Sequence, residues 1–407
     1  MNLFFKKDPY KVYIYTCFLS QLFFTFIFTM NLLYQVEIVK LDPLQLVLVG
    51  TVLEASVFLF EIPTGIVSDL KSRKLSILIG YFLIGIGFIL EGMFPYFITV
   101  IASQIVWGIG YTFTSGAQQA WIADEIGEER ARDAFIIGAK AGNLGKIIAI
   151  PLSMLAGYFM INLPIVLGGF GMIGLSIILF FFMKEEQFKP ADHSERVSTW
   201  KTIKNNMNQI IAFSKRSSLM RILFLIALFF GFYSEGFDRL WISHILKAME
   251  LIDLPEGRLV FLVGGIQFIV VIISFLALHF ISQSSIYQKL TSIYAALFAG
   301  SVLIICSLVG FALSSYLIVL LIFYIIIQVA RYVMHPLEDI WLNQMIPDSS
   351  TRATFFSVKG QVDAIGQISG GPVIGLIALN FTIKTAILAC AFLLTPVLVL
   401  YRKILKK

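Results

Sequence analysis

Two glutamates, Glu54 and Glu61, stand seven residues apart inside one long apolar stretch of the chain. A helix turns about 100° per residue, so this spacing puts both carboxylates on nearly the same face, roughly 10 Å apart along the axis. An ionised acid near the middle of a bilayer costs on the order of 3 kcal/mol on insertion scales, which argues against a lipid-facing position. We therefore expect this face to meet water, a partner or a substrate. There a carboxylate can bind a proton in one conformation and release it in another.

Both glutamates also have a purely structural interpretation, as hydrogen bonds or ion pairs that only hold neighbouring helices together. Lys146 stands near the middle of a later apolar stretch, and a buried ammonium needs a partner as much as a buried carboxylate does. We expect Lys146 to pair with Glu54, either permanently or until a proton or a substrate competes. Lys140, nearer the end of the same stretch, is expected to extend to the lipid headgroups.

Charged residues also interrupt the apolar stretches of the second half, at Glu235, Asp238, Arg239, Arg331 and Asp363. Residues three or four apart face each other on a helix, so Glu235 is expected to contact Asp238 or Arg239 in a self-contained cluster. Lys359 lies one turn from Asp363, whereas Arg331 has no oppositely charged residue within a turn. These groups are candidates for substrate or proton binding, with local charge pairing as the alternative.

A short polar turn follows the stretch that holds the two glutamates, in the pattern Gly65-x-x-x-Asp69-x-x-x-Arg73-Lys74. An acid at a helix end can rest against the positive N-terminus of another helix, and basic residues can hold a loop at the headgroups. We expect Gly65, Asp69, Arg73 and Lys74 to form a gating latch. Residues that only fix the membrane topology would give the same pattern.

The sequence contains no pattern that is typical of a metal site, a cofactor site or an enzyme active site. His335, Glu338 and Asp339 lack the spacing of a metal site and are expected to be solvated charges at the end of a span. The three cysteines are far apart in sequence and predict neither a disulfide framework nor a metal cluster. The chain has no phosphate-binding glycine loop and no hydrolase motif. We therefore expect no metal, no cofactor and no enzymatic activity.

The composition is that of a membrane protein. Of 407 residues, 58% are hydrophobic and 14% are charged, whereas soluble domains carry about 25% charged residues. The net charge of +6 is modest, and no basic patch interleaved with aromatic residues predicts nucleic-acid binding. The lipid bilayer is the expected partner, with many spans rather than one anchor.

Apolar runs of about 20 residues predict an all-α membrane protein with twelve spans in two sets of six. A long polar segment, residues 184–219, separates an N-terminal bundle (1–183) from a C-terminal bundle (220–407). The expected spans are residues 10–38, 44–67, 75–92, 95–122, 134–159, 163–183, 220–247, 257–281, 289–311, 315–340, 353–378 and 382–402.

The distribution of basic residues predicts the orientation. Of the 31 Lys and Arg residues, 22 fall in segments on the same side as the N-terminus, four fall in segments on the other side, and five lie within or at the ends of spans. Cytoplasmic segments carry such an excess of positive charge. Both termini are therefore expected in the cytoplasm of a cell whose membrane the chain crosses many times.

A weak internal repeat links the two halves. A shift of 220 residues superimposes Trp121, Ile126, Glu128, Arg132 and Phe135 on Trp341, Ile346, Asp348, Arg352 and Phe355. A repeat that keeps its orientation after six spans is typical of two parallel half-bundles related by an axis along the membrane normal.

Together, the two sets of six spans, the central polar segment and the turn from Gly65 to Lys74 resemble the major facilitator superfamily over essentially the whole chain. Within it the chain is most similar to bacterial drug:proton antiporters, particularly tetracycline exporters of the clostridial type, which carry two glutamates seven apart in the second span. Where many relatives have an arginine in the fourth span, this chain has Gln104.

This resemblance implies a monomeric, proton-coupled antiporter that exports a drug, with tetracycline, including its metal-chelated cation, as the best substrate guess. Alternating access would come from rocking of the two halves around a site near the midplane. Two alternatives stay open: a superfamily member that imports or exports another amphiphile or nutrient, and a membrane sensor or scaffold that transports nothing.

Overall fold

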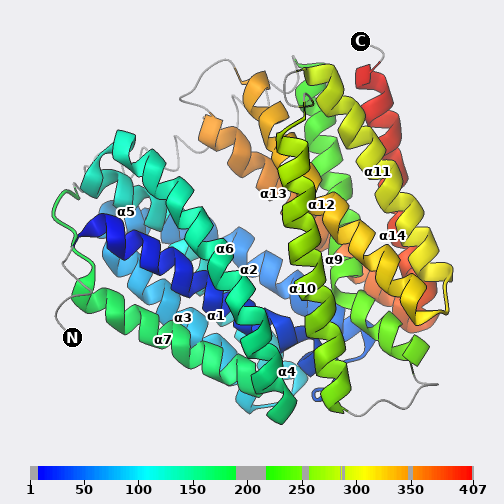
Figure 1. The fold of residues 1–407 in the computed structure, drawn as a ribbon, viewed down its shortest axis with the longest axis horizontal. Coiled ribbons are helices and arrows are strands. Elements are labelled where there is room, and N and C mark those ends of the chain that lie inside the picture. Colours follow the sequence, from blue (N-terminus) through cyan, green and yellow to red (C-terminus); the bar gives the residue numbers. More distant parts are fainter. Residues whose placement is uncertain are drawn as a thin grey trace. The chain divides into compact units, whose positions relative to one another are not determined.

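The computed structural model describes residues 8–188, 217–249, 256–284, 286, 289–346 and 352–405. Within these ranges the chain is helical, and twelve segments are long and apolar enough to cross a membrane, with α4 and α5 forming one span (Figure 1). The predicted all-α fold with twelve spans is thus confirmed. The helices are α1 (Pro9–Glu37), α2 (Pro43–Leu70), α3 (Arg73–Met93), α4 (Phe97–Thr114), α5 (Ala117–Ile126), α6 (Glu128–Phe159), α7 (Leu163–Phe182), α9 (Ser218–Met249), α10 (Glu256–Ser282), α11 (Leu290–Leu313), α12 (Leu317–Met345), α13 (Arg352–Asn380) and α14 (Ile383–Leu405).

The fourth span departs from the prediction of one continuous helix over 95–122. It breaks between α4 and α5, where Gly116 has a φ of 71°. α5 ends at Gly127, which has a φ of 81°. Both angles lie in the left-handed region that glycine enters at little cost. α6 then starts at Glu128, so that most of the predicted loop between the fourth and fifth spans is helical.

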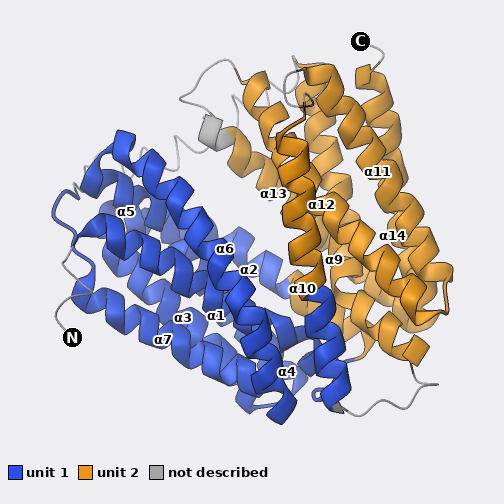
Figure 2. Ribbon diagram, viewed as in Figure 1, with its two compact units in different colours: residues 1–41, 52–195, 255–267 blue, residues 42–51, 196–254, 268–407 orange. Residues whose placement is uncertain are grey.

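The chain forms two compact units, shown in different colours in Figure 2. The first contains residues 1–41, 52–195 and 255–267, and the second contains residues 42–51, 196–254 and 268–407. Helices α2 and α10 each contribute to both units. Most of the predicted linker, 184–219, lies outside the described residues, and the domain limits at 183 and 220 remain a prediction.

Each unit has the same internal packing pattern. In the first, α1 packs on α6, and α3 packs on α4 and α7. In the second, α9 packs on α13, and α11 packs on α12 and α14. These pairs correspond after a shift of six spans, the same shift that relates the buried side chains of Trp121 and Trp341. The side chains of Asp348 and Arg352, two members of the sequence repeat, lie outside the described part.

Glycines bring α9 and α13 into direct backbone contact. A Cβ added at Gly366 would overlap the carbonyl oxygen of Leu228, and one added at Gly370 would lie 2.5 Å from the carbonyl oxygen of Phe232. Gly360, on the same helix, has open space where its Cβ would be. The close crossing of these helices therefore depends on the absence of side chains at particular α13 positions.

We expect Gly366→Ala to lower the stability of the protein by about 1–3 kcal/mol, because a methyl group must separate the two backbones. Gly360→Ala is the matched control, and it is expected to be neutral or to stabilise by up to about 1 kcal/mol, since alanine favours the helix. Thermal unfolding of both purified variants measures the difference. Equal melting temperatures would contradict the packing argument.

Candidate functional site

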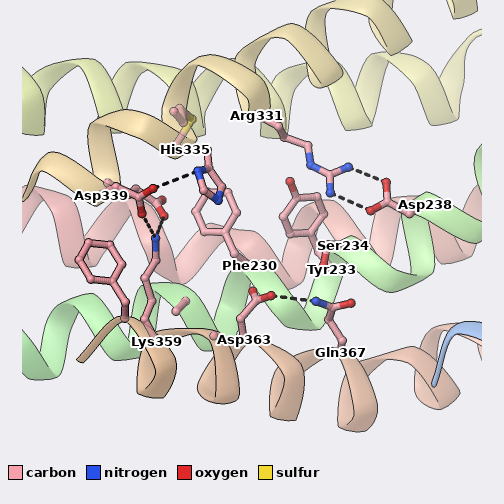
Figure 3. Close-up of a pocket in the computed structure, with 15 residues that line it drawn as sticks. Phe230, Tyr233, Ser234, Asp238, Arg331, His335, Asp339, Lys359, Asp363 and Gln367 are labelled. Carbon is pink, nitrogen blue, oxygen red and sulfur yellow. Dashed lines mark hydrogen bonds and ion pairs between the residues drawn. The ribbon is translucent and has the colours of Figure 1, made fainter. Parts of the chain in front are cut away.

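Helices α9, α12 and α13 of the second unit surround a cavity of about 400 Å³, called here the Arg331 cavity (Figure 3). Its wall combines aromatic rings with an unusual concentration of charged and amide groups for a membrane-spanning segment. The side chains that line it include Phe230, Tyr233, Asp238, Arg331, His335, Glu338, Asp339, Lys359, Asp363 and Gln367.

Arg331 and Asp238 form a two-point ion pair between α12 and α9. The guanidinium Nη1 and Nη2 donate to the two carboxylate oxygens at 2.5 and 2.7 Å. The same guanidinium lies 5.9 Å from the centre of the Tyr233 ring. Arg331 therefore has a partner that its sequence neighbourhood did not indicate, and the alternative of Asp238 in a local cluster with Glu235 is wrong.

The other local contact predicted for Glu235 is confirmed. Arg239 Nε donates to Glu235 Oε1 at 2.9 Å, one turn away, and Glu235 is 5% exposed. Neither residue lines the Arg331 cavity. Gly50 at the start of α2 lies so close that a Cβ there would overlap the Glu235 carboxylate. The pair between Glu235 and Arg239 therefore lies where α9 packs against the first part of α2, within the second unit.

Lys359 bridges two acids at the end of the Arg331 cavity. Its ammonium lies 3.0 Å from Glu338 and 3.3 Å from Asp339, and His335 Nδ1 lies 3.3 Å from Asp339. The prediction of solvated charges holds for His335, whose side chain is 76% exposed, whereas Glu338 and Asp339 are half-buried and paired with Lys359. They form one connected network between α12 and α13.

Asp363 takes no part in that network, although Lys359 is one turn away. Its carboxylate accepts a hydrogen bond from Gln367 Nε2 at 2.8 Å, and no cation of the described chain lies within ion-pair distance. A carboxylate held by a neutral amide can gain or lose a proton without breaking an ion pair. Asp363 therefore has the simplest arrangement for proton exchange in this cavity.

Tyr233 adds an unused polar group to the same wall. Its side chain is fully buried, and its hydroxyl has no hydrogen-bond partner among the described residues. Figure 3 shows this ring beside the Arg331 guanidinium. A buried hydroxyl without a partner costs free energy, so a water molecule or a bound substrate is expected to satisfy it.

A second cavity, called here the Lys146 cavity, has a volume of about 430 Å³ and lies within the first unit, among α1, α5 and α6. Lys146 and several amide side chains line it, and neither Glu54 nor Glu61 does. Within the described ranges, Lys146 makes no ion pair. The predicted pair between Lys146 and Glu54 is therefore wrong. The sequence shows how deep each residue lies in the membrane, but not the direction in which its side chain points from the helix axis.

Glu54 and Glu61 are both half-buried on α2. Both carboxylates interact electrostatically with Tyr111 of α4. This shared neighbour agrees with the common face that the seven-residue spacing predicts. Their roles in proton or substrate binding remain a proposal.

The polar turn after α2 is held by protein groups. Arg73 Nε pairs with Asp124 of α5 at 2.7 Å, and Lys74 Nζ donates to the carbonyl of Phe180 at 3.0 Å. Glu185 accepts hydrogen bonds from the Ser72 hydroxyl and the Lys74 backbone. The two cations thus bind protein acceptors, not headgroups alone. Asp69 is exposed, and Gly65 has open space around it.

Glu91, near the end of α3, is 0% exposed and is a buried acid that was not predicted from the sequence. Its Oε1 accepts from Asn31 and Gln35 of α1 at 2.8 and 2.7 Å, and its Oε2 accepts from Ser103 and Gln104 of α4 at 3.0 and 3.1 Å. Four donors on two oxygens fill the accepting capacity of an ionised carboxylate. The signal was available, since Glu91 is one more acid inside an apolar run.

Gln104 is oriented by a further contact. Trp107 Nε1 donates to Gln104 Oε1 at 2.9 Å, which turns the amide nitrogen toward Glu91. The position where many relatives have an arginine therefore supplies a neutral donor here. The result is a polar link between α3 and α4 and, through Asn31 and Gln35, α1.

Comparisons with known proteins agree with this architecture. The family model described as Major Facilitator Superfamily matches residues 13–337. An uncharacterized MFS-type transporter, YxaM of Bacillus subtilis (strain 168), is 26% identical over 369 residues, covering 88% of this chain and 86% of the relative. The crystal structure of the nucleoside transporter NupG covers 98% of this chain and 100% of its own, with a TM-score of 0.75 and 16% identity. A bacterial homologue of the human lysosomal transporter Spinster, inward-facing and occupied, covers 97% of each chain, with a TM-score of 0.75 and 15% identity.

The chain belongs to the Major Facilitator Superfamily, because the family model spans most of its length. It is therefore a multi-pass membrane protein and a secondary transporter of a small molecule, not an enzyme. The solved structures share its fold at low sequence identity, and their substrates are their own.

Proposed function

We propose that this transporter is a proton-coupled antiporter that exports a small amphiphilic drug, with tetracycline, including its metal chelate, as the first substrate to test. The observation that carries proton coupling is Asp363, an acid within a membrane-spanning helix that borders the Arg331 cavity and is held by a neutral amide. Glu54 and Glu61 are the proposed coupling acids of the first unit. Acidic groups in a cavity of low dielectric constant favour a cationic substrate.

In this proposal the protein is a monomer in the cell membrane with both termini in the cytoplasm. Residues 1–183 and 220–407 form the two halves that move relative to each other during transport. The excess of Lys and Arg in the segments on the N-terminal side supports the orientation. Gly65, Asp69, Arg73 and Lys74 are proposed to control the cytoplasmic gate, and the ion pair between Arg73 and Asp124 would hold this turn against α5.

We expect Asp363→Asn and Glu54→Gln each to lower tetracycline-driven proton flux in vesicles by about tenfold or more, because an amide cannot bind and release the coupled proton. Glu129→Gln is the control, since this glutamate is exposed at the start of α6. Cellular accumulation of labelled tetracycline, with and without a protonophore, measures the export itself. Flux that is unchanged in both variants would overturn proton coupling through these acids.

A second candidate is transport of another amphiphile or nutrient in either direction. The Lys146 cavity favours it, because the residues that line this cavity include a cation and no acid. Unaltered cellular tetracycline combined with flux of another solute would select this alternative.

A further inference from the structure

The Lys146 cavity concentrates hydrogen-bond donors that the protein itself leaves unused. Gln21, Gln119, Asn143 and Lys146 line it, and none of them makes a side-chain hydrogen bond within the described part of the chain. Three are amides, each with two N–H donors, and the fourth is an ammonium with three donors. Gln119 and Asn143 are exposed, and Gln21 and Lys146 are half-buried, so these donors are accessible to a ligand that accepts hydrogen bonds.

A fifth side chain, Gln118 on α5, is turned in the same direction. The Tyr81 hydroxyl donates to Gln118 Oε1 at 3.0 Å, which leaves the amide nitrogen to face Cys17 at 3.6 Å. Cys17 also lines the cavity, and a thiol is a weak acceptor. The second N–H of Gln118 is therefore available to a ligand.

The charge of this cavity is positive. Lys146 is the one ionic group among the side chains that line it, and no carboxylate of the described chain pairs with that ammonium. Lys146 is half-buried, and an ammonium that is partly removed from water without a counter-charge is destabilising, which an anionic ligand would offset. The Arg331 cavity differs, because its two cations are already bound to carboxylates.

An aromatic wall completes the cavity. Tyr13 and Phe135 lie edge to face, with ring centres 6.0 Å apart, and both line it. Gly138 and Gly142 let α6 approach α1 closely on the same wall. Rings of this kind favour a flat apolar body beside the charged group.

We propose that the Lys146 cavity is a substrate subsite for an organic anion, a flat ring that carries a carboxylate or a comparable acidic group. Lys146 binds the negative charge, and the amides of Gln21, Gln118 and Asn143 donate to its oxygens. This inference rests on the second candidate of the proposed function, a substrate other than a cationic drug, and it narrows that substrate to one with an anionic group.

The test uses a matched pair of probes, 1-naphthoate and its uncharged amide, 1-naphthamide. Calorimetric titration of the purified full-length protein is expected to show at least tenfold tighter binding of the anion. Lys146→Met is expected to remove this preference, whereas Lys146→Arg should keep most of it. Lys140→Met, an exposed lysine on the same helix outside the cavity, should leave it unchanged.

Three results would overturn the subsite: equal affinity for the two probes, binding of neither, or a preference that survives Lys146→Met. Lys146→Met should still bind the uncharged 1-naphthamide as the unmodified protein does, which would show that its lost preference does not come from misfolding. The proposed function fails separately. If tetracycline flux is absent while the preference for naphthoate holds, the anion subsite is supported and tetracycline is not the substrate. If tetracycline flux is present without that preference, the drug assignment is supported and the subsite is not.

Discussion

Replacing Glu91 by alanine is expected to destabilise the protein by on the order of 3–5 kcal/mol, because four buried donors lose their common acceptor. Asn31, Gln35, Ser103 and Gln104 would each keep a polar group in an interior that offers few replacements. Water that enters the vacated space would satisfy some of them, so the expected loss is smaller than the sum of four separate penalties. Thermal unfolding of the purified variant measures the effect.

Two further variants sharpen this test. Glu91→Gln keeps the shape but turns an amide N–H₂ toward donors, so an intermediate loss of about 1–3 kcal/mol is expected. Glu129→Ala removes an exposed glutamate and is expected to cost less than about 1 kcal/mol. If Glu91→Ala and Glu129→Ala have the same melting temperature, the network around Glu91 does not hold α1, α3 and α4 together.

The fold could be predicted from the sequence because the bilayer imposes it. A span needs about 20 apolar residues, and the polar residues between such runs mark the ends of helices within a few positions. The break at Gly116 could not be predicted in the same way. Glycine is common inside membrane helices, so its presence alone does not show whether the backbone turns there.

The candidate site was predictable only where partners are neighbours in sequence. Glu235 and Arg239 are four apart on one helix, and they pair as expected. Asp238 and Arg331 are 93 residues apart, and their pairing depends on which faces of α9 and α12 meet. A single sequence gives the depth of each charge in the membrane but not its direction around the helix axis. The missing direction around the helix axis also explains why the predicted pair between Lys146 and Glu54 is wrong.

The Arg331 and Asp238 pair leads to the second prediction with a large expected effect. Arg331→Met is expected to cost about 1–3 kcal/mol, since it leaves a carboxylate in a membrane-spanning helix without its two-point partner. The expected loss of stability is smaller than for a fully buried ion pair, because the side chains of Arg331 and Asp238 are 25% and 37% exposed. Asp238→Asn should cost a similar amount, and the double variant should cost less than the sum of the two.

The pair between Lys184 and Glu186, with side chains 39% and 61% exposed, is the matched control, and its coupling energy should stay below about 1 kcal/mol. Equal couplings in the two pairs would show that the cavity does not shield Arg331 from solvent. The double variant of Arg331 and Asp238 also separates structure from function. If it keeps both stability and transport, the pair only joins α9 and α12. If it keeps stability but loses transport, these charges act in the transport cycle itself, because the helix contact that they support has been restored without them.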